Sequence, residues 1–431
     1  MSYTWLSPYR TICSQRGLAG WALGRSSRLY HELSYSKYGP ASDVLEYRQL
    51  DHIYDSAIGS HRTSDRNGVQ VDFIYAPVHP AHLNAIEGRY PDPNTLKFPE
   101  RNAVDLEARC IGGGEGVARV SAIHENGAQE VFDIFNRSIK VGDFVVMAQP
   151  GFGTWRSHAN VIANEHLIKL PQHALFPSST YTNSLLVSAA QISTNPCTAY
   201  RMISDFVDLK PGDVVIQNGG ASAVGICVSQ LLRKRGVFTV SIVRKGERSV
   251  SQFECLRDYV LRVGKASLVI CEEEFCGEKG GGGNSLLKKE LSQLDGVGGS
   301  SFALPKLALN CVGGKSALAL TKCIAQGGTM VTYGGMSKMP LTIPTGLLIF
   351  RDIRLRGYWQ SRYVVKHQAN DDSRKKMVDE IIQDVVNGNL NMGYTKEFRL
   401  EDYRDALNYN WNTSDESDGL PRKVLFRCTE D

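Results

Sequence analysis

The stretch that most restricts the fold is 209–248, because its residue pattern changes from strand to helix and back to strand. A Pro-Gly-Asp turn leads into an apolar run, 213–217, which is typical of a buried parallel strand. After a loop of small residues, 222–232 favours a helix that ends in basic residues and Gly236. The β-rich run 237–243 completes a β-α-β unit, so a parallel sheet with crossover helices is expected.

A glycine pattern in the loop of this unit indicates a dinucleotide site. Gly220, Ser222 and Gly225 occupy the positions of a G-x-G-x-x-G fingerprint, with Ser in place of the middle Gly. Small residues there let the backbone approach a pyrophosphate seated at a helix N-terminus. Gly-rich turns also connect elements without binding anything, but the strands and helix around this one favour the binding function.

The end of the second strand distinguishes between the two nicotinamide dinucleotides. An acidic residue roughly 20 positions after the fingerprint would bind the ribose hydroxyls of the unphosphorylated cofactor. This chain has a basic cluster there instead, with Arg244, Lys245, Gly246 and Arg248. Guanidinium groups bind phosphate with two hydrogen bonds, so the cluster favours NADPH with its 2′-phosphate. The alternative interpretation is a solvated strand end.

Length, charge and cysteine spacing exclude several other classes of protein. The 431 residues, 42% hydrophobic and 22% charged, suffice for two globular domains with separate cores. The net charge of +4 is too small to argue for nucleic acid, and no apolar run reaches membrane-spanning length. The ten cysteines include no C-x-x-C pair. We therefore expect no structural metal and no redox dithiol, but reduced thiols in an intracellular protein.

The N-terminal segment, 1–33, has the composition of an organellar leader. It contains several arginines and serines and no acidic residue before Glu32. This composition matches a mitochondrial transit peptide. The alternative is a disordered basic tail, whereas a secretory signal fits poorly because no unbroken apolar region follows the first positive charge.

Short β runs separated by turns fill the chain from Lys37 to about Tyr200 and predict a β-barrel-like domain ahead of the nucleotide domain. The clearest runs are 69–75, 118–123, 144–147 and 153–161. Within this part, a short helix at 82–87 ends at Gly88 and leaves Tyr90 on a loop. Glycines at 112–114 indicate a backbone that closely approaches either a ligand or a barrel corner.

The second half of the chain alternates again between strands and helices. Runs 307–314 and 328–336 predict buried strands whose glycine-bearing ends line the crevice of an open parallel sheet. The Gly-rich stretch 276–301 predicts an exposed, flexible insertion. A helix at 372–387 and a strand at 423–427 are expected to return the chain to the first domain.

Several segments in this order make the chain similar to a known superfamily. The most specific are 195–202 (NPCTAYRM), 309–316 (LNCVGGKS), 327–336 (GGTMVTYGGM) and 348–359 (LIFRDIRLRGYW). The chain resembles the medium-chain dehydrogenase/reductase superfamily and, within it, the zinc-independent mitochondrial 2-enoyl thioester reductases. The similarity runs from about Tyr38 to the C-terminus and is interrupted by the Gly-rich insertion.

This resemblance implies an α/β fold, with a Rossmann-type doubly wound parallel sheet and a β-rich, GroES-like catalytic domain. It assigns 34–195 and 361–431 to the catalytic domain, and 196–360, with the insertion 276–301, to the NADPH-binding domain. It also implies a homodimer in the mitochondrial matrix. The implied reaction uses NADPH to reduce the trans-2 double bond of enoyl thioesters of acyl carrier protein or coenzyme A, the last step of the mitochondrial fatty acid synthesis cycle.

The same resemblance implies site residues. The family's catalytic Tyr lies in a motif like N-P-x-D-x-N-x-I-Q-G-x-Y-P, and 79–91 reads HPAHLNAIEGRYP, so Tyr90 takes its role. Tyr90 would donate a hydrogen bond to the thioester oxygen, where negative charge develops, and supply or relay a proton to the α-carbon. The implied NADPH contacts are Asn195, Ala221, Ser222, Ala223, Val224, Arg244, Lys245, Gly246, Tyr333, Gly334, Gly335, Met336, Tyr358, Trp359, Gln360 and Arg422.

The chain departs from the family pattern around the catalytic Tyr. His79, His82, Glu87 and Arg89 replace the more usual Asn, Asp, Gln and an apolar residue, which puts the environment of the Tyr in question. Gly113-Gly114-Glu115 stands where superfamily alcohol dehydrogenases carry Gly-His-Glu, so no catalytic zinc is expected. Two other classes stay open, namely an NADPH quinone or alkenal reductase and a non-catalytic structural subunit.

Overall fold

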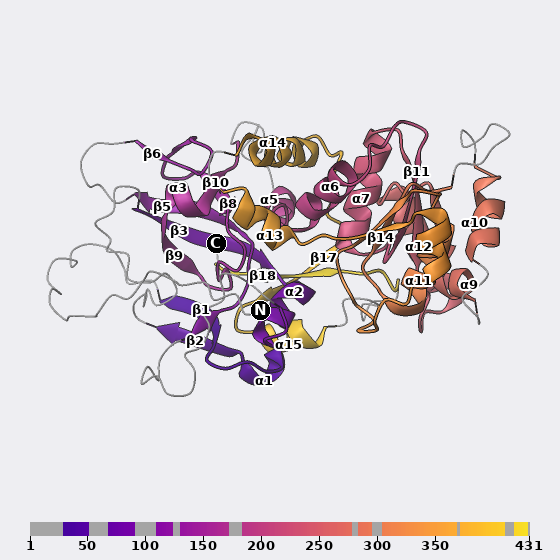
Figure 1. Cartoon of the computed structure of the whole chain (residues 1–431). Helices are drawn as coiled ribbons and strands as arrows, with labels where there is room; N and C mark the ends of the chain where they lie inside the picture. Colours follow the sequence, from indigo (N-terminus) through magenta and orange to yellow (C-terminus); the bar gives the residue numbers. More distant parts are fainter. Residues whose placement is uncertain are drawn as a thin grey trace, which may run out of the picture.

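The chain forms a β-rich domain and a parallel-sheet domain, which lie at left and at right in Figure 1. The predicted leader lies outside the described residues except for 29–33, where Tyr30 and Leu33 are buried in strand β1 (Tyr30–Tyr35). The predicted leader boundary therefore falls within a strand of the folded domain. The computed structural model describes residues 29–50, 68–90, 109–123, 130–171, 183–277, 283–294, 304–368, 371–409 and 418–429.

A seven-stranded sheet forms the centre of the β-rich domain, flanked by two smaller sheets (Figure 1). The large sheet has the order β10 (Leu167–Lys169), β8 (Phe144–Met147), β5 (Val117–Ile123), β3 (Gly68–Pro77), β18 (Lys423–Arg427) and β17 (Thr395–Arg399), and β9 (His158–Ile162) also pairs with β3. The small sheets are β2 (Glu46–Leu50), β1 and β4 (Cys110–Ile111), and β6 (Val131–Phe132) with β7 (Ser138–Ile139). The β-rich prediction is confirmed.

Strand β3 shows how the sequence positions the later site. Val69, Val71, Phe73 and Tyr75 are buried while the residues between them are half-buried, which is the period of two expected for a strand. The strand runs directly into helix α2 (Pro80–Ile86), whose predicted existence is confirmed. Among the other predicted strands, 153–161 is wrong in its first residues, because the strand there begins only at His158.

The second domain is built on a six-stranded parallel sheet. Its order is β13 (Leu268–Cys271), β12 (Phe238–Val243), β11 (Val214–Asn218), β14 (Leu307–Asn310), β15 (Thr329–Thr332) and β16 (Arg354–Gly357). All neighbouring pairs are parallel, and the strand order reverses between β11 and β14. The doubly wound fold is therefore confirmed, and the reversal marks the crevice where such sheets bind ligands.

Helices cover both faces of this sheet because successive strand residues point to opposite sides. Val215, Leu307 and Val331 pack with helix α7 (Ala223–Lys234), and α8 (Val250–Arg262) lies next to α7. Val214 and Met330 face the other way, toward α9 (Glu272–Cys276), α10 (Gly283–Leu291) and α11 (Gly314–Cys323). A short helix, α12 (Thr345–Arg351), precedes the edge strand β16.

The middle part of the Gly-rich insertion forms a helix. Residues 283–291 form helix α10, and the side chains of Leu287 and Leu291 are fully buried against the sheet. The prediction of an exposed segment is therefore wrong for 283–291, because these two leucines lie one helical turn apart and form an apolar face. The flanking glycine-rich residues, 278–282 and 295–303, lie outside the described part of the chain.

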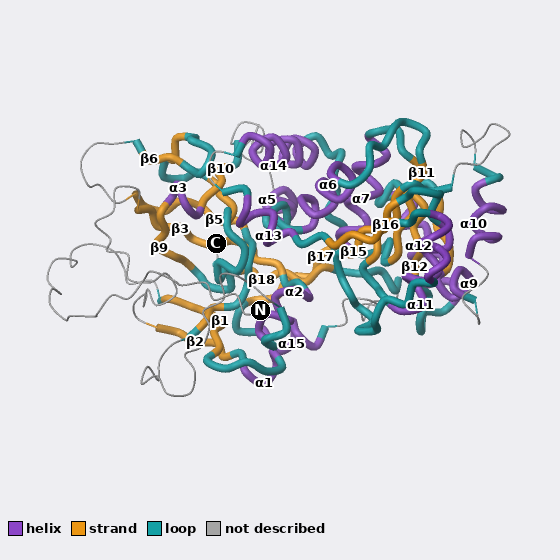
Figure 2. Tube along the Cα trace, in the orientation of Figure 1, coloured by secondary structure: helices purple, strands orange, loops and turns teal. Residues whose placement is uncertain are grey.

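The chain passes to the second domain and returns through helices that pack together between the two sheets (Figure 2). These are α5 (Asn183–Ala189), α6 (Asn195–Asp205), α13 (Gln360–Lys366) and α14 (Asp372–Val386). After α14, the chain forms β17, α15 (Tyr403–Asn408) and β18, so the predicted return to the first domain is confirmed. The short helices α1 (Ala41–Val44) and α3 (Ala163–His166) complete the β-rich domain.

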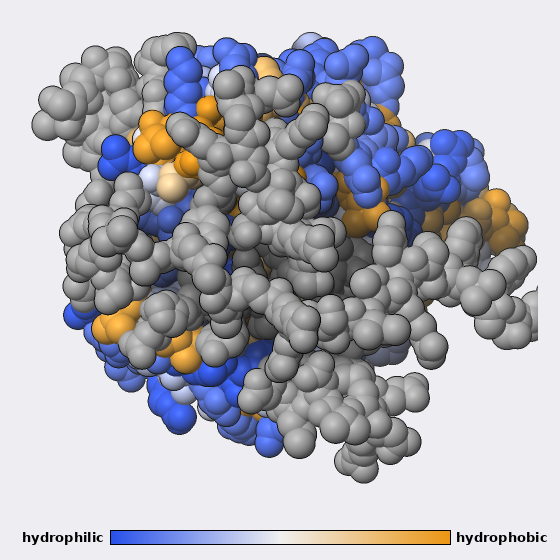
Figure 3. Space-filling model, turned by 90° about the vertical axis from the view of Figure 1, so that its left-hand side faces the viewer, coloured by the Kyte–Doolittle hydropathy of each residue, from blue (hydrophilic) through white to orange (hydrophobic). Residues whose placement is uncertain are grey.

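The surface and helix lengths complete this description. In the view onto the β-rich end, hydrophilic residues form most of the surface that is visible beside the grey atoms (Figure 3). No helix of the described residues combines the length and the apolar character that crossing a membrane requires.

Candidate active site

A cavity opens between the β-rich domain and the helices that lead into the second domain. Its wall is mostly apolar and includes Val146, Met147, Ile168, Ile192, Val364, Met377, Val378 and Ile381. The polar residues of the lining are His82, Tyr90, Gln149, Ser193, Thr194, Gln360, Ser361 and Arg374. An apolar wall with a few polar groups is typical of a site for a small molecule.

The loop after α2 places Tyr90 in this cavity. Pro80 begins the helix, and Gly88 ends it with a φ of +72°, where a Cβ would lie 2.9 Å from Cγ of Tyr38. Beyond the glycine, the backbone N–H groups of Arg89 and Tyr90 both donate to the carbonyl of Asn84, at 2.8 and 3.1 Å. The turn therefore fixes the direction in which the Tyr90 side chain leaves the loop.

A contact across the two domains holds the phenol of Tyr90. The indole Nε1 of Trp359 donates a hydrogen bond of 2.6 Å to the Tyr90 hydroxyl oxygen, and the two rings meet edge to face at 5.9 Å. Because a phenol accepts and donates at the same time, this bond orients the ring without using its proton. Trp359 was predicted to contact the cofactor; in this structure, its indole N–H binds Tyr90.

The neighbours of Trp359 were also predicted to contact the cofactor, and they form a second link. The Tyr358 hydroxyl donates to Oε1 of Gln360 at 2.5 Å, and Gln360 itself lines the cavity. The ring of Tyr358 packs edge to face on Phe206 at 6.2 Å, and burial raises the pKa of Tyr358. Tyr358 thus supports Gln360, whose Nε2 donates in turn to the carbonyl of Ser193 at 3.5 Å.

The glycine fingerprint forms the expected tight link between strand β11 and helix α7. A Cβ on Gly220 would lie 2.5 Å from Cβ of Ser241, and one on Gly225 would lie 2.7 Å from the carbonyl oxygen of Gly219. Ser222 is the N-cap of α7, and its hydroxyl accepts a hydrogen bond from the Gly225 N–H at 3.1 Å. Ala221, Ala223 and Val224 lie around this cap, at the positively polarised end of the helix.

The basic cluster follows strand β12 as predicted. The backbone N–H groups of Lys245 and Gly246 donate to the carboxylate of Glu273, at 3.1 and 2.9 Å, which fixes the turn. Arg244 is exposed on this turn. Arg248 is half-buried, and its Nε donates to the carbonyl of Gly419 at 2.9 Å. The turn thus presents Arg244 to solvent.

The ends of the central strands meet at the reversal of strand order. Asn218 at the end of β11 donates from Nδ2 to Oδ1 of Asn310 in β14, and accepts from the Cys311 N–H; both bonds are 2.8 Å. The predicted residues Tyr333, Gly334, Gly335 and Met336 follow the next strand, β15. No atom lies within 4 Å of a Cβ built on Gly335, so space remains at this edge.

Asn195, another predicted cofactor residue, carries an unused donor. It is the first residue of α6 and is buried, yet its Nδ2 has no hydrogen-bond partner among the described residues. A buried amide donor is costly to leave unpaired, so this atom fits a ligand that offers an oxygen. The residues present therefore fit a nicotinamide dinucleotide with its amide end beside α6.

Arg422 was predicted to contact the cofactor, but the next residue, Lys423, is the one that joins the polar residues beside the cavity. Arg422 forms an ion pair with Asp418 (Nη2 to Oδ2, 2.8 Å) and its guanidinium lies 5.8 Å from the ring centre of Tyr394. The next residue, Lys423, instead reaches His79, with 2.7 Å between its Nζ and Nδ1 of the imidazole.

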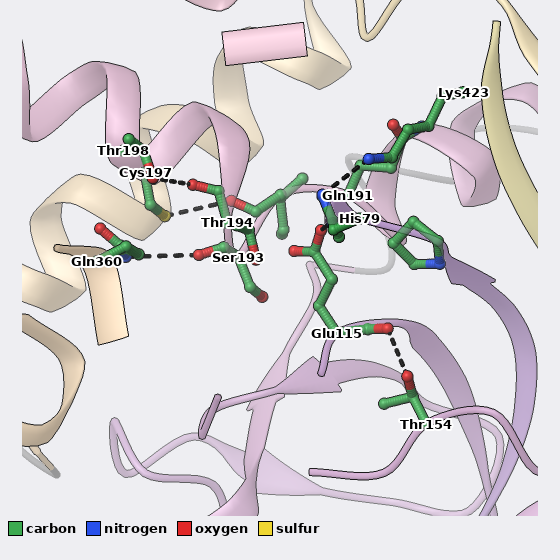
Figure 4. A network of polar contacts seen from close by, with 12 residues as sticks. His79, Glu115, Thr154, Gln191, Ser193, Thr194, Cys197, Thr198, Gln360 and Lys423 are labelled. Carbon is green, nitrogen blue, oxygen red and sulfur yellow. Dashed lines mark hydrogen bonds and ion pairs between the residues drawn. The ribbon is translucent and has the colours of Figure 1, made fainter. Parts of the chain in front are cut away.

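Sequence reasoning missed the buried polar network that Lys423 joins (Figure 4). On the far side of the imidazole, Nε2 of His79 contacts Oε1 of Glu115, and both side chains are buried. Figure 4 shows the Glu115 carboxyl group between His79 and the segment that carries Thr194. The available signals were the His at position 79, where the family has Asn, and an acidic residue after a run of glycines.

Burial sets the charges in this network. It holds the pKa of His79 and of His82 well below the usual range, so both imidazoles are neutral near pH 7. It raises the pKa of Glu115 to about 7 and lowers that of Lys423 to about 8. These two groups therefore change charge within the physiological range, and perturbed groups beside a cavity indicate a functional site.

His82 fills the space that Gly114 leaves open. A Cβ on Gly114 would lie 2.8 Å from Nε2 of His82, and the His82 ring meets those of His79 and Trp155 edge to face, at 4.8 and 5.8 Å. The residues at 79, 82 and 114 are therefore matched in shape. Among the described residues, no group of three or more metal-binding side chains could hold an ion.

Comparison with known proteins gives strong matches over most of the chain. The mitochondrial enoyl-acyl-carrier-protein reductase of Homo sapiens is 36% identical over 375 residues, which are 87% of this chain and 84% of that protein. The Caenorhabditis elegans protein of the same name is 38% identical over 340 residues, 79% of this chain and 82% of that protein. No protein-family model matches.

Solved structures agree with these relatives. The complex of Etr1p with NADP and crotonyl-CoA covers 93% of this chain and matches over its own full length, with a TM-score of 0.72 and 28% identity. Etr1p also occurs in a solved heterodimer with Etr2p, described as a mitochondrial 2-enoyl thioester reductase from Candida tropicalis; this match has the same coverage of both chains, TM-score and identity.

The fit between Gly114 and His82 gives a first prediction. Gly114→Ala forces His82 out of its place, and overpacking of this kind costs about 1–3 kcal/mol. We expect the free energy of unfolding, measured by urea denaturation of the cofactor-free protein, to fall by that amount. Gly335→Ala is the matched control, because its Cβ meets no atom within 4 Å. Equal stability of the two variants would contradict the packing of His82 on Gly114.

Proposed function

This chain belongs to the family of mitochondrial enoyl-acyl-carrier-protein reductases, and we propose that the cavity between its domains is the active site of that reaction. The protein is an oxidoreductase that uses NADPH to reduce the trans-2 double bond of enoyl thioesters. The observation that carries the proposal is Tyr90, which lines the cavity and is held there by Trp359 from the other domain.

The cavity suits the acyl part of such a substrate. Its apolar wall, from β8, α13 and α14, offers an acyl chain contacts that water does not, since burial of apolar surface is favourable. We place the reacting end of the chain beside Tyr90, which lines the same cavity. Tyr90 and Gln360 then face the thioester and its double bond.

NADPH, when bound, supplies the hydride that adds to the β-carbon of the enoyl group. The fingerprint loop and the start of α7 would hold the pyrophosphate, Arg244 would bind the 2′-phosphate, and the unused donor of Asn195 would be available to the nicotinamide amide. Tyr90 donates a hydrogen bond to the thioester oxygen as negative charge builds there, and it supplies the proton to the α-carbon. Trp359 keeps the phenol in position for both tasks.

The finer assignments follow from the family. The protein is mitochondrial, and we place it in the matrix, as expected for an enzyme of mitochondrial fatty acid synthesis. Its substrates are thioesters of coenzyme A or of acyl carrier protein. The leader ends before β1, because Tyr30 and Leu33 are core residues and their removal would leave an unfilled core.

A second copy of this chain fits the open edge of the parallel sheet. Strand β16 pairs only with β15 among the described strands, so its other edge presents unpaired N–H and C=O groups. Large apolar side chains are exposed around this edge, at Met336, Met339, Leu341, Leu348, Ile349, Phe350 and Leu355. We infer that two copies join β16 to β16 in a symmetric homodimer, which pairs the edge and buries the apolar surface.

The test of the reaction is NADPH consumption with crotonyl-CoA, compared between the native protein and Tyr90→Phe. We expect turnover to fall roughly tenfold or more in the variant, the scale of a lost acid catalyst. Tyr47→Phe is the matched control, because that hydroxyl bonds His31 outside the cavity. Near-normal turnover in Tyr90→Phe would remove Tyr90 from the mechanism, and turnover of a quinone but not of crotonyl-CoA would refute the proposed substrate.

The choice of cofactor is tested at Arg244. Arg244→Ala loses a charge-assisted contact worth about 1.5–3 kcal/mol, so we expect NADPH to bind roughly ten- to a hundredfold more weakly. NADH lacks the phosphate, and its affinity should stay nearly unchanged. Fluorescence titration measures both dissociation constants, with Arg262→Ala on α8 as an exposed control. Equal losses for the two cofactors would show that Arg244 does not read the phosphate.

The proposed dimer is tested by placing charge on its surface. Phe350→Asp together with Leu355→Asp buries two carboxylates if the dimer forms, so we expect monomers in sedimentation velocity where the native protein is a dimer. Val250→Asp on α8 also replaces an exposed apolar residue and should leave the dimer intact. A native monomer, or a double variant that dimerises as the native protein does, would contradict this interface.

A further inference from the structure

Glu115 is a buried carboxyl group that the proposed reaction does not use. It is 1% exposed and lies directly after Gly114, which lines the cavity. Its second oxygen, Oε2, has no hydrogen-bond partner of ordinary geometry among the described residues, although Thr194 lies close to the carboxyl group. A buried carboxylate lowers the stability of the fold unless an opposite charge or hydrogen-bond donors compensate it.

The hydrogen bonds around Glu115 have a fixed direction. An ammonium group only donates, so Lys423 donates to Nδ1 of His79, and the neutral imidazole carries its proton on Nε2. Nε2 then donates to Oε1 of Glu115. A negative and a positive side chain are thus joined through one neutral ring, and the proton on Glu115 depends on both partners.

Of the other titratable groups that face Glu115, only Lys423 carries a charge. His82 from α2 and His79 stay neutral because burial holds their pKa well below the usual range. Burial raises the pKa of the Cys197 thiol from α6 and of the Cys227 thiol from α7, both to about 12. Arg374 lines the same cavity and is positive throughout this pH range. Among the described groups that face Glu115, the charge that changes near pH 7 is therefore that of Glu115 and Lys423.

This wall is where the nicotinamide would lie. Gly114, which directly precedes Glu115, and Thr194, which lies close to its carboxyl group, both line the cavity, and Asn195, with its unused donor, follows Thr194. The nicotinamide ring is neutral in NADPH and positive in NADP+. Resting on the proposed function, we propose that Glu115 senses this change of charge: the protein gives up the Glu115 proton when it binds NADP+ and keeps it when it binds NADPH.

Electrostatics gives the direction in which pH changes the binding of NADP+ relative to NADPH. A positive ring a few ångströms from a carboxylate favours its ionised form and lowers its pKa by about 1–3 units. Starting from a pKa of about 7, the protonated fraction of Glu115 grows as the pH falls from 8 to 6, and NADP+ must then displace that proton. NADP+ binding therefore weakens relative to NADPH binding as the pH falls.

The experiment measures the dissociation constants of NADP+ and NADPH for the native protein at pH 8 and at pH 6. We expect their ratio, NADP+ over NADPH, to rise roughly five- to tenfold at the lower pH, as a shift of one unit or more in the pKa requires. The 2′-phosphate titrates near pH 6 in both cofactors, so it cancels in the ratio. A ratio that stays constant overturns the inference.

Substitutions test which residues cause the pH dependence of the ratio. Glu115→Gln keeps the shape but not the proton, and most of the pH dependence of the ratio should disappear, because only Lys423 then changes charge at this wall. Lys423→Met removes the positive charge that lowers the pKa of Glu115, so the rise should begin at a higher pH. Glu254→Gln on α8 is the matched control and should behave as the native protein. A ratio in Glu115→Gln that changes with pH as much as in the native protein assigns the proton elsewhere and overturns the inference.

A second measurement needs no variant, in case Glu115→Gln fails to fold. Titration of the native protein with NADP+ in weakly buffered solution at pH 6.5 should release more protons than titration with NADPH. Equal release overturns the inference. A failure of this inference can be told from a failure of the proposed function. If the protein reduces crotonyl-CoA with NADPH but the ratio of its NADP+ and NADPH dissociation constants does not change with pH, the proposed function holds and only the role of Glu115 is wrong.

Discussion

The antiparallel pairing of β18 with β3 is the interaction on which the site depends. Phe426 pairs with Ala76 and Leu425 with Pro77, so the last strand of the chain lies beside the strand that leads into α2. This pairing closes the β-rich domain after the chain has formed the whole parallel-sheet domain. It also sets Lys423 against His79, two residues beyond the end of β3. The same strand register therefore closes the β-rich domain and places the ammonium group of Lys423 beside the cavity wall.

The buried charges at this wall are a poor source of stability. Removing an ammonium and a carboxylate from water costs several kcal/mol per ion, and their attraction rarely repays it. The bridge through His79 limits that cost, since the ring accepts from one group and donates to the other. An apolar trio of the same volume would stabilise the fold at least as well. The polar network is therefore better explained by the chemistry of the cavity than by folding.

The sequence predicts best what is local. The β-α-β unit is predicted nearly to the residue, because strand, loop and helix patterns are read from neighbouring positions, and Tyr90 is found through one short motif. The His79 network joins residues 36 and 344 positions apart, so no spacing pattern reveals it. Helix α10 escapes notice for another reason, since its two buried leucines are surrounded by glycines that favour a loop.

The contact between Tyr90 and Trp359 links the chemistry to the arrangement of the domains. Tyr90 follows α2 in the β-rich domain, whereas Trp359 lies two residues beyond the last strand of the parallel sheet, 269 positions later. A hydrogen bond weakens steeply when its geometry degrades, so a small rotation between the domains separates the indole from the phenol. In the mechanism that we propose, Tyr90 would then be oriented as an acid only when the two domains lie as they do here. Proton donation would thereby be confined to the domain arrangement in which hydride transfer is also possible.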